Sequence, residues 1–244
     1  MKVLGIDIGG SAFKGAPVDL RTGQLLAERH RVEIPSPCPR AAGLAAAREI
    51  ARHFHWKGPI GIGFPGIVLG ERIDAVGNLG DVWERQNGAV LFGRATGCKV
   101  SLANDADAAG LAEMRYGAGR DQRGTVLMLT FGTGIGSALF RDGQLMPNIE
   151  FGHIPWRGKP IERFASAAAR KRARLDWPDW AKRVNVFLQV VERLCSPDLI
   201  IVGGGVSKKS DKWFRYIKCR AKFVAAKMHN DAGIVGAALA ARRD

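Results

Sequence analysis

The sequence is poor in cysteine and contains no long apolar segment. Its four cysteines, Cys38, Cys98, Cys195 and Cys219, lie far apart without a CxxC pair, which argues against a structural zinc site. No run approaches the roughly 20 apolar residues that span a bilayer. The amino-terminal apolar stretch is interrupted by Asp7 and is too short and too polar for a secretory signal. We therefore expect a cytoplasmic protein with no zinc site and no membrane partner.

Acidic residues are scarce relative to basic ones, because 37 Lys and Arg stand against 23 Asp and Glu and give a net charge of +14. Two stretches hold much of this excess. Residues 156–183 contain nine basic and three acidic residues, and residues 207–222 contain seven and one. Such a field attracts polyanions, which include nucleic acids, acidic membranes and phosphate polymers. A solvated basic surface that only aids solubility is the alternative.

The order of expected strands and helices is repeated along the chain. Strands are predicted at 3–8, 15–20 and 25–32, a helix at 40–54, a short strand at 60–63, a second helix before 97, a strand at 100–102 and a helix from 104 or 105 to 115. A second cycle has strands at 125–130 and up to 140, helices between 161 and 194, a strand at 199–202, a basic helix, and a last helix from 230 or 231 to 241.

This repeated order is that of a duplicated α/β fold, the actin-like ATPase (ribonuclease H-like) architecture with two lobes around a central cleft. The hairpins GIDIGGSAFKGAPVDL and TFGTGIGSALFRDGQL are the part of the repeat that is visible in the sequence. We expect a smaller amino-terminal lobe of residues 1–104, on which a closing helix of residues 230–244 packs, and a larger lobe of residues 105–229.

Glycine-rich turns are the candidate phosphate sites. Glycine leaves backbone N–H groups uncovered, so that a phosphate oxygen can approach them, although a single such turn is more often only a tight turn. A carboxylate at the end of the first strand suits hydrated Mg²⁺. A third glycine run precedes the basic helix and permits a base or ribose to lie against the backbone. The candidates are Asp7, Gly9, Gly10, Ser11, Lys14, Thr133, Gly134, Gly204 and Gly205.

Two further motifs carry polar groups suited to an acceptor. In SLANDADAAG, Asp105 is the candidate base and Asn104 the orienting amide, because phosphoryl transfer needs an aligned hydroxyl and a group that accepts its proton. The alternative is that Asp105 only caps the helix. In PNIEFGHIPW, Glu150 and His153 flank a glycine and can face one pocket, where a carboxylate would accept from vicinal sugar hydroxyls. A structural histidine is the alternative.

Together these motifs resemble the ROK family of sugar kinases over nearly the whole chain, residues 5–240. GIDIGGSAFKGA and LTFGTGIGSALF look like the two phosphate motifs of the family, and LANDADAAGLAEMRYGAG is similar to its acceptor motif. PNIEFGHI resembles the sugar-binding element, GFPGIV the segment that borders the sugar cleft, and IIVGGGVSKKSDKW with NDAGIVGAA the nucleotide-side glycines and closing helix. NDADAAGLAE and TFGTGIGSA resemble the branch of polyphosphate glucokinases and polyphosphate/ATP glucomannokinases.

The resemblance implies transfer of a phosphoryl group from inorganic polyphosphate, with ATP as a second donor, to the 6-hydroxyl of glucose in the presence of Mg²⁺. It implies a homodimer whose lobes close on a hinge, with no nucleic acid as partner. Asp105 would be the catalytic base and Asp7 would hold Mg²⁺ through water. Glucose would be bound by Gly66, Asn104, Asp105, Glu150 and His153, and the donor by Asp7, Gly9, Gly10, Ser11, Lys14, Thr133, Gly134, Gly204 and Gly205.

The sequence also departs from the family. The cysteine-rich zinc motif of many members is absent, and Pro155 and Trp156 follow His153 where many members have Leu-Glu, so Glu162 is a candidate substitute for that glutamate. The alternatives are a strictly ATP-dependent kinase for glucose, mannose or an amino sugar, and a non-catalytic sugar or polyphosphate binder. A sugar-responsive repressor is disfavoured, because the first strand begins at Val3 with no helix-turn-helix before it.

Overall fold

The computed structural model describes residues 1–77 and 79–242, which form two compact units. Unit 1 takes Met1–Ala112 and Asp231–Asp244, and unit 2 takes Glu113–Asn230. The division falls inside helix α3 (Asp105–Tyr116) instead of at its start, where we had placed the boundary. The physical reason is that the first turns of α3 pack on the closing helix of unit 1, with the Ala108 carbonyl against Gly236.

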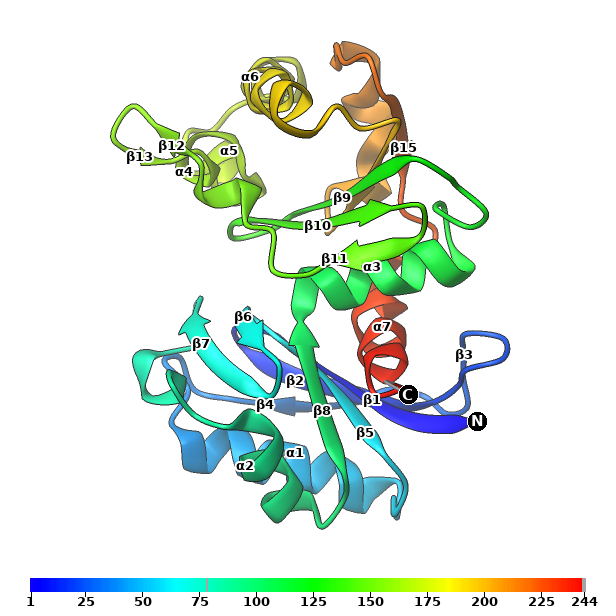
Figure 1. The fold of residues 1–244 in the computed structure, drawn as a ribbon. Helices are drawn as coiled ribbons and strands as arrows, with labels where there is room; N and C mark the ends of the chain where they lie inside the picture. The colour runs from blue at the N-terminus through cyan, green and yellow to red at the C-terminus, as the bar shows by residue number, and fades with distance from the viewer. Residues whose placement is uncertain (78, 243–244) are drawn as a thin grey trace. The chain divides into compact units, whose positions relative to one another are not determined.

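A six-stranded sheet forms the centre of unit 1 (Figure 1). Its order is β3-β2-β1-β5-β8, with β4 also paired to β2. Strands β1 and β2 are antiparallel, whereas β1, β5 and β8 are parallel and therefore end at one edge. The strands are β1 (Lys2–Ile8), β2 (Ala12–Asp19), β3 (Gln24–Leu25), β4 (His30–Glu33), β5 (Ile60–Phe64) and β8 (Val100–Asn104). A separate hairpin of β6 (Gly66–Leu69) and β7 (Arg72–Val76) follows β5.

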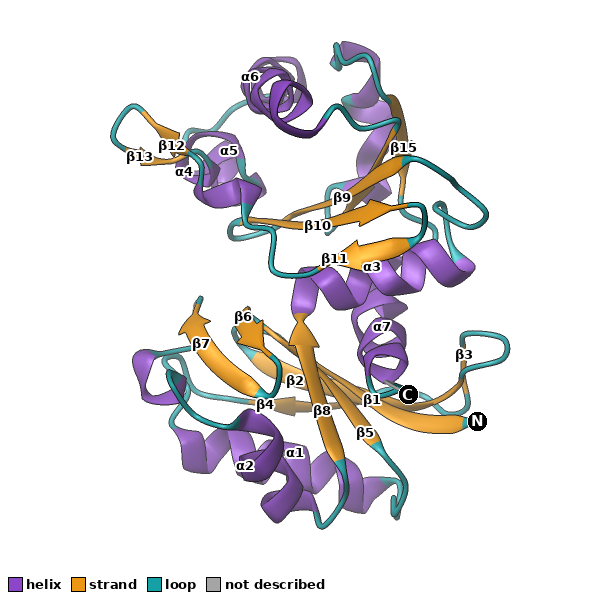
Figure 2. Cartoon of the chain, viewed as in Figure 1, coloured by secondary structure: helices purple, strands orange, loops and turns teal. Residues whose placement is uncertain are grey.

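Helices cover both faces of this sheet (Figure 2). Because side chains alternate along a strand, Leu4 and Ile6 of β1 point to the core shared with α1 (Arg40–His53) and α2 (Gly88–Thr96). Gly5 points to the opposite face, where it meets Ile234 of α7 (Ala232–Ala240). The first strand and the last helix, drawn blue and red in Figure 1, thus lie side by side.

The contact of α7 with the sheet is made backbone to backbone. A Cβ at Gly61 of β5 would overlap the carbonyl oxygen of Ala237, and a Cβ at Gly236 would overlap that of Ala108. Each added Cβ would meet a backbone carbonyl oxygen, and a backbone atom cannot move aside by changing rotamer. The close approach fixes α7 against both β5 and the first turns of α3.

The sheet of unit 2 repeats that of unit 1. Its order is β11-β10-β9-β14-β15, with β9 and β10 antiparallel and β9, β14 and β15 parallel. The series β10-β9-β14-β15 therefore matches β2-β1-β5-β8 in order and direction, which confirms the predicted duplicated α/β fold. The strands are β9 (Thr125–Phe131), β10 (Ile135–Arg141), β11 (Gln144–Met146), β14 (Leu199–Gly203) and β15 (Lys222–Ala225), with a short ribbon of β12 (Pro155–Trp156) and β13 (Lys159–Pro160).

Three helices, α4 (Glu162–Ala165), α5 (Ala167–Arg172) and α6 (Trp177–Cys195), follow that ribbon. Asp176 caps α6 by accepting a hydrogen bond of 2.8 Å from the Asp179 backbone N–H. The core against α6 is aromatic, since Phe131 lies edge-on to both Trp180 and Trp213 at centroid distances of 5.7 and 6.1 Å. Among the described helices, none combines the length and the apolar composition of a membrane span.

Two predicted elements of the sequence were wrong. The strand expected at 25–32 is split into β3 and β4, because the chain leaves the edge of β2 after Leu25 and returns to the same strand at His30. The expected basic helix is two 3₁₀ turns, Ser207–Lys212 and Phe214–Tyr216, followed by β15. Trp213 breaks this segment, because its buried ring joins the core and its Nε1 donates to the Val206 carbonyl.

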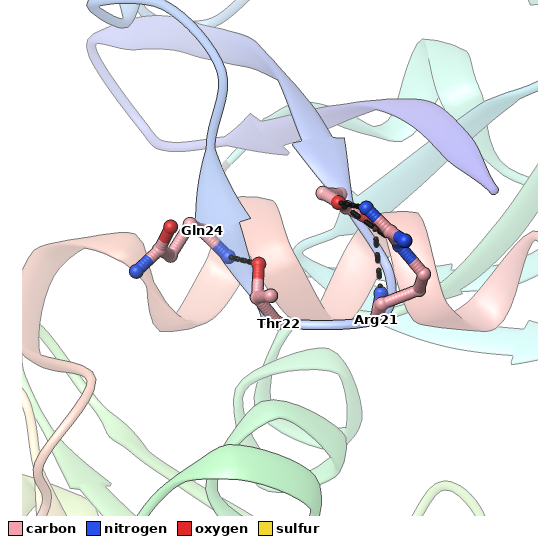
Figure 3. A network of polar contacts seen from close by, with 4 residues as sticks. Arg21, Thr22 and Gln24 are labelled. Atoms are coloured by element: carbon pink, nitrogen blue, oxygen red, sulfur yellow. Dashed lines mark hydrogen bonds and ion pairs between the residues drawn. The ribbon is translucent and has the colours of Figure 1, made fainter.

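The turn after β2 is closed by its own polar groups (Figure 3). Arg21 donates to Asp19 from its backbone N–H at 3.0 Å and from its guanidinium, and the Gln24 backbone N–H donates to Thr22 Oγ1. The hydrogen bonds from Arg21 lower the pKa of Asp19 to about 2. Side-chain hydrogen bonds therefore define the β2–β3 connection, for which the sequence predicts only a turn.

Substituting Gly61 with alanine tests the packing of α7. The added methyl would meet the Ala237 carbonyl, so we expect Gly61→Ala to reduce the free energy of unfolding by more than about 3 kcal/mol in guanidinium denaturation. Gly10→Ala is the matched control, because no atom lies within 4 Å of its Cβ position. Equal stability of the two variants would contradict the assigned packing.

Candidate active site

The carboxyl ends of the parallel strands gather the predicted polar residues of unit 1. In register, Asp7 of β1 pairs with Gly63 of β5, and Phe64 pairs with Asn104 of β8. The first glycine turn and the start of α3 therefore lie at the same edge. This edge brings together Asp7, Gly9, Gly10, Ser11, Lys14, Gly66, Asn104 and Asp105.

Asp7 faces the first turn of α7. A Cβ at Gly233 would lie 2.7 Å from the Asp7 carboxylate, so only glycine leaves room for it. Burial raises the pKa of Asp7 above its ordinary value. Lys14, the residue of β2 that pairs with Asp7, acts to lower this pKa. The positive end of the α7 dipole also favours the charged form. Asp7 is thus a desolvated carboxylate that a bound cation would stabilise.

Asn104, not Asp105, caps helix α3. Asn104 Oδ1 accepts from the Asp107 backbone N–H at 2.9 Å, and its Nδ2 donates to the Gly66 carbonyl at 3.0 Å. Asp105 is half-buried at the first position of the helix, and its Oδ1 accepts from the Ala106 N–H at 2.8 Å. The capping position, which the sequence leaves open between the two residues, is thus taken by Asn104.

In unit 2 two glycine turns lie at the carboxyl edge of another pair of parallel strands, β9 and β14. A Cβ at Gly204 would contact the backbone of Phe131, so the turn after β14 packs directly on the end of β9. The carbonyl of Gly132 accepts from the Ala168 N–H at 3.0 Å, which ties the turn after β9 to α5. These contacts place Thr133 and Gly134 on one turn beside Gly204 and Gly205 on the other.

The loop that carries Glu150 is fixed to the start of β10. Gly152 lies so close to the Ile135 carbonyl that a Cβ would overlap it. The buried Ser137 hydroxyl donates to the Ile149 carbonyl and accepts from the Phe151 N–H, so it braces the backbone on both sides of Glu150. His153 is exposed two residues after Phe151. Ser137 is a positioning residue that the sequence analysis had quoted within a motif without assigning it a role.

The electrostatics of Glu150 depend on two neighbours. Burial raises the pKa of Glu150, His153 acts to lower it, and the negative charge of Glu162 acts to raise it. Glu162, the candidate substitute for the family glutamate, accepts from the Ile135 N–H at 3.0 Å and lies against Gly134. One of its oxygens therefore supports the second glycine turn.

Three glycines, one in each turn, are not required by any contact within the protein. No atom lies within 4 Å of the Cβ position of Gly10, Gly132 or Gly205, and φ at each lies outside the left-handed region. Other open glycines, such as Gly70 and Gly143, have the positive φ that a turn demands. The free space at the three turns is what a ligand needs to approach backbone N–H groups.

A cavity of about 400 Å³ opens where the two turns of unit 2 meet. Its walls carry basic side chains that the sequence analysis had counted only as part of the charge excess, and none of its described lining residues is acidic. Their signal in the sequence was the position of the two basic stretches beside the glycine turns. The lining includes Gly132, Thr133, Arg170, Lys171, Gly205 and Lys209.

The burial of Asp7 has a measurable consequence for stability. Because its pKa is higher in the folded than in the unfolded chain, the wild-type free energy of unfolding falls as pH rises above the ordinary value of 3.8, and the loss is complete once Asp7 is ionised in the fold. Asp7→Asn removes this loss. We expect the variant to be more stable than wild type at neutral pH, with a flatter pH dependence above the ordinary pKa of 3.8 in chelator-containing buffer. A less stable variant at neutral pH would refute the desolvation argument.

Comparisons with known proteins identify the family of the chain. The model of the ROK family matches residues 3–169. The polyphosphate glucokinase of Mycobacterium tuberculosis (strain CDC 1551 / Oshkosh) is 44% identical over 241 residues, 98% of this chain and 91% of that protein. The structure of the inorganic polyphosphate/ATP-glucomannokinase of Arthrobacter sp. strain KM has a TM-score of 0.94 and 41% identity, covering 98% of each chain. A ROK family glucokinase of Streptomyces griseus, solved with glucose and AMPPNP, has a TM-score of 0.82 and 25% identity over 100% of each chain. The chain belongs to the ROK family.

Proposed function

We propose that this chain is a polyphosphate glucokinase that phosphorylates the 6-hydroxyl of glucose from inorganic polyphosphate, with ATP as a second donor. The observation that carries the proposal is the free space at Gly10, Gly132 and Gly205, where no side chain shields the backbone of three separate turns. The resemblance to the Mycobacterium tuberculosis and Arthrobacter enzymes supports both donor and acceptor. The alternative is a strictly ATP-dependent hexose kinase, and more distant relatives are named glucokinase.

In the proposed reaction Asp105 accepts the proton of the glucose 6-hydroxyl. The glucose O6 forms a bond to the end phosphorus of the polyphosphate, while the bond from that phosphorus to the rest of the polyphosphate breaks. The products are glucose 6-phosphate and a polyphosphate that is one phosphate shorter. Asn104 already caps helix α3, so the Asp105 carboxylate is not needed as a helix cap. Asn104 Nδ2 donates to the Gly66 carbonyl, which holds the amide at the edge of the sheet where the sugar hydroxyls are proposed to bind.

Glu150 and His153 are the proposed hydroxyl-binding pair on the sugar. The ionised carboxylate of Glu150 accepts hydrogen bonds from glucose hydroxyls. The two hydrogen bonds of Ser137, to the residues before and after Glu150, fix its backbone position. Gly66 contributes its backbone, since a side chain there would overlap the Ala75 carbonyl of the β6–β7 hairpin. Pro155, which replaces a family leucine, begins the β12–β13 ribbon beyond this pair.

The donor phosphates are assigned to the glycine turns, with Gly9, Gly10, Ser11 and Lys14 in unit 1 and Thr133, Gly134, Gly204 and Gly205 in unit 2. Asp7 fits a Mg²⁺ ion held through water, because it is one desolvated carboxylate, and Mg²⁺ in phosphoryl-transfer sites uses one or two carboxylates together with substrate phosphates. When bound, the ion would neutralise charge on the donor. The homodimer and the cytoplasmic location remain predictions.

The role of Asp105 is tested by Asp105→Asn. Loss of the proton acceptor is expected to lower kcat by about 10²–10⁴-fold, while KM for glucose changes by less than about threefold. Steady-state kinetics on the folded variant measure both values, and Asp121→Asn, at an exposed aspartate outside the site, serves as control. Activity within about tenfold of wild type would refute the assignment.

The donor is tested by a coupled assay for glucose 6-phosphate with long-chain polyphosphate or ATP as the sole phosphate source. We expect product with polyphosphate, and we expect KM for polyphosphate to rise with ionic strength much more than KM for glucose, because only the polyanion is attracted by the +14 charge. Product with ATP alone would favour the ATP-dependent alternative, and no product with either donor would exclude a glucokinase.

A further inference from the structure

The two basic stretches of the sequence contribute side chains to one cavity. Arg170 and Lys171 come from α5 in the first stretch, and Lys209 comes from the 3₁₀ turn in the second, although 38 positions separate Lys171 from Lys209 in the chain. All three line the cavity of about 400 Å³ in unit 2 that also contains Gly132 and Gly205. Positive side chains and glycines with open Cβ positions therefore occur together there.

These cations are not neutralised by the protein. In the part of the chain that the structure describes, Lys171, Lys209 and the Arg170 guanidinium form no ion pair, and Arg170 Nε is buried without a hydrogen-bond partner. A buried charged donor without an acceptor costs stability, since its desolvation is not compensated. This applies to Arg170 Nε, whereas Lys171 and Lys209 are exposed to solvent. By contrast, Lys182 on the nearby helix α6 is paired with Asp179 at 2.7 Å. The cavity is thus set apart by positive charge that lacks an internal partner.

The Arg170 guanidinium also lies against the ring of Trp177, which lines this cavity. Its guanidinium carbon lies 3.7 Å from the centroid of the Trp177 ring, a cation–π contact that covers one face of the indole. Trp177 is itself packed edge-on to the buried Trp180, at a centroid distance of 5.8 Å. An adenine base could not stack on the covered face without displacing Arg170. This wall of the cavity therefore combines an aromatic ring with a positive charge.

We propose that Arg170, Lys171 and Lys209 form a subsite for the donor phosphates beyond the one that is transferred, and that this subsite makes the enzyme prefer inorganic polyphosphate to ATP. The proposal rests on the proposed function and deepens it. A polyphosphate chain carries an anionic phosphate at each position, whereas ATP carries an uncharged nucleoside beyond its third phosphate. Cations at those positions therefore strengthen binding of polyphosphate more than binding of ATP.

Another basic hollow, in unit 1, makes a useful contrast. It is lined by Arg21, Lys57, Lys99 and Arg242 and lies at the carboxyl end of α7. The partial negative charge of helix carbonyls at that end opposes an anion, so its cations also serve to neutralise the helix terminus. A diffuse attraction of polyphosphate to the whole basic protein would involve this hollow as much as the cavity of unit 2.

The test compares two double variants that each remove two positive charges from unit 2. Lys171→Gln with Lys209→Gln alters the subsite, whereas Lys208→Gln with Lys212→Gln alters exposed lysines on the same segment that do not line the cavity. We expect the subsite pair to raise KM for polyphosphate by about tenfold or more and KM for ATP by less than about threefold. The control pair should change both by less than about threefold, and Arg170→Gln should act in the same direction as the subsite pair.

Equilibrium binding of long-chain polyphosphate, measured by calorimetry without glucose, gives a second readout that does not need turnover. The subsite pair should weaken binding by about tenfold relative to the control pair. If wild type binds polyphosphate with this pattern but makes no glucose 6-phosphate, the subsite stands and the proposed function fails. Equal weakening by both pairs, equal weakening by Lys57→Gln with Lys99→Gln, or equal effects on polyphosphate and ATP would overturn the subsite.

Discussion

The close contact of α7 with β1, β5 and α3 is the constraint on which the arrangement of unit 1 depends. Glycines at positions 5, 61 and 236 remove the side chains that would otherwise separate these elements. Because backbone meets backbone, the contact has little freedom to shift, and it fixes the first turn of α7 against Asp7 and the first turn of α3 beside the end of β5. The packing of α7 with β1, β5 and α3 therefore positions the candidate carboxylates Asp7 and Asp105.

Unit 2 uses the same principle with different partners. Gly204 allows the turn after β14 to lie on the end of β9, and Gly152 allows the Glu150 loop to lie on the start of β10. Ser137 supplies hydrogen bonds to the backbone of the Glu150 loop, and Glu162 accepts one from the Ile135 N–H beside the turn after β9. Polar residues of the site are thus carried on loops that glycine contacts and side-chain hydrogen bonds attach to strand ends.

The sequence predicted the duplicated α/β order because glycine-rich turns and apolar strands have strong local signals. The residues at strand ends, such as Asp7 and Asn104, were identifiable because parallel strands end at one edge. The split of the third strand was not identifiable, since it depends on which edge of β2 remains open. The 3₁₀ turns around Trp213 were also missed, because burial of one ring in a distant core overrides the local helical tendency of a lysine-rich segment.

The cavity with Arg170 and Lys209 shows what charge counting alone cannot provide. Both basic stretches were evident from composition, but their shared position beside Gly132 and Gly205 follows from the tertiary fold of unit 2. The capping role of Asn104 is similar, because either Asn104 or Asp105 satisfies the sequence rule for a helix start and only the geometry separates them.

The account as a whole depends on donor phosphates binding to the backbone of the turns that carry the open glycines. A crystal structure of the chain soaked with tripolyphosphate measures this directly. We predict phosphate oxygens within hydrogen-bond distance, about 2.7–3.2 Å, of the backbone nitrogens of Thr133 and Gly134. Tripolyphosphate found only in the basic hollow around Lys57 and Lys99, with the glycine turns unoccupied, would contradict the account.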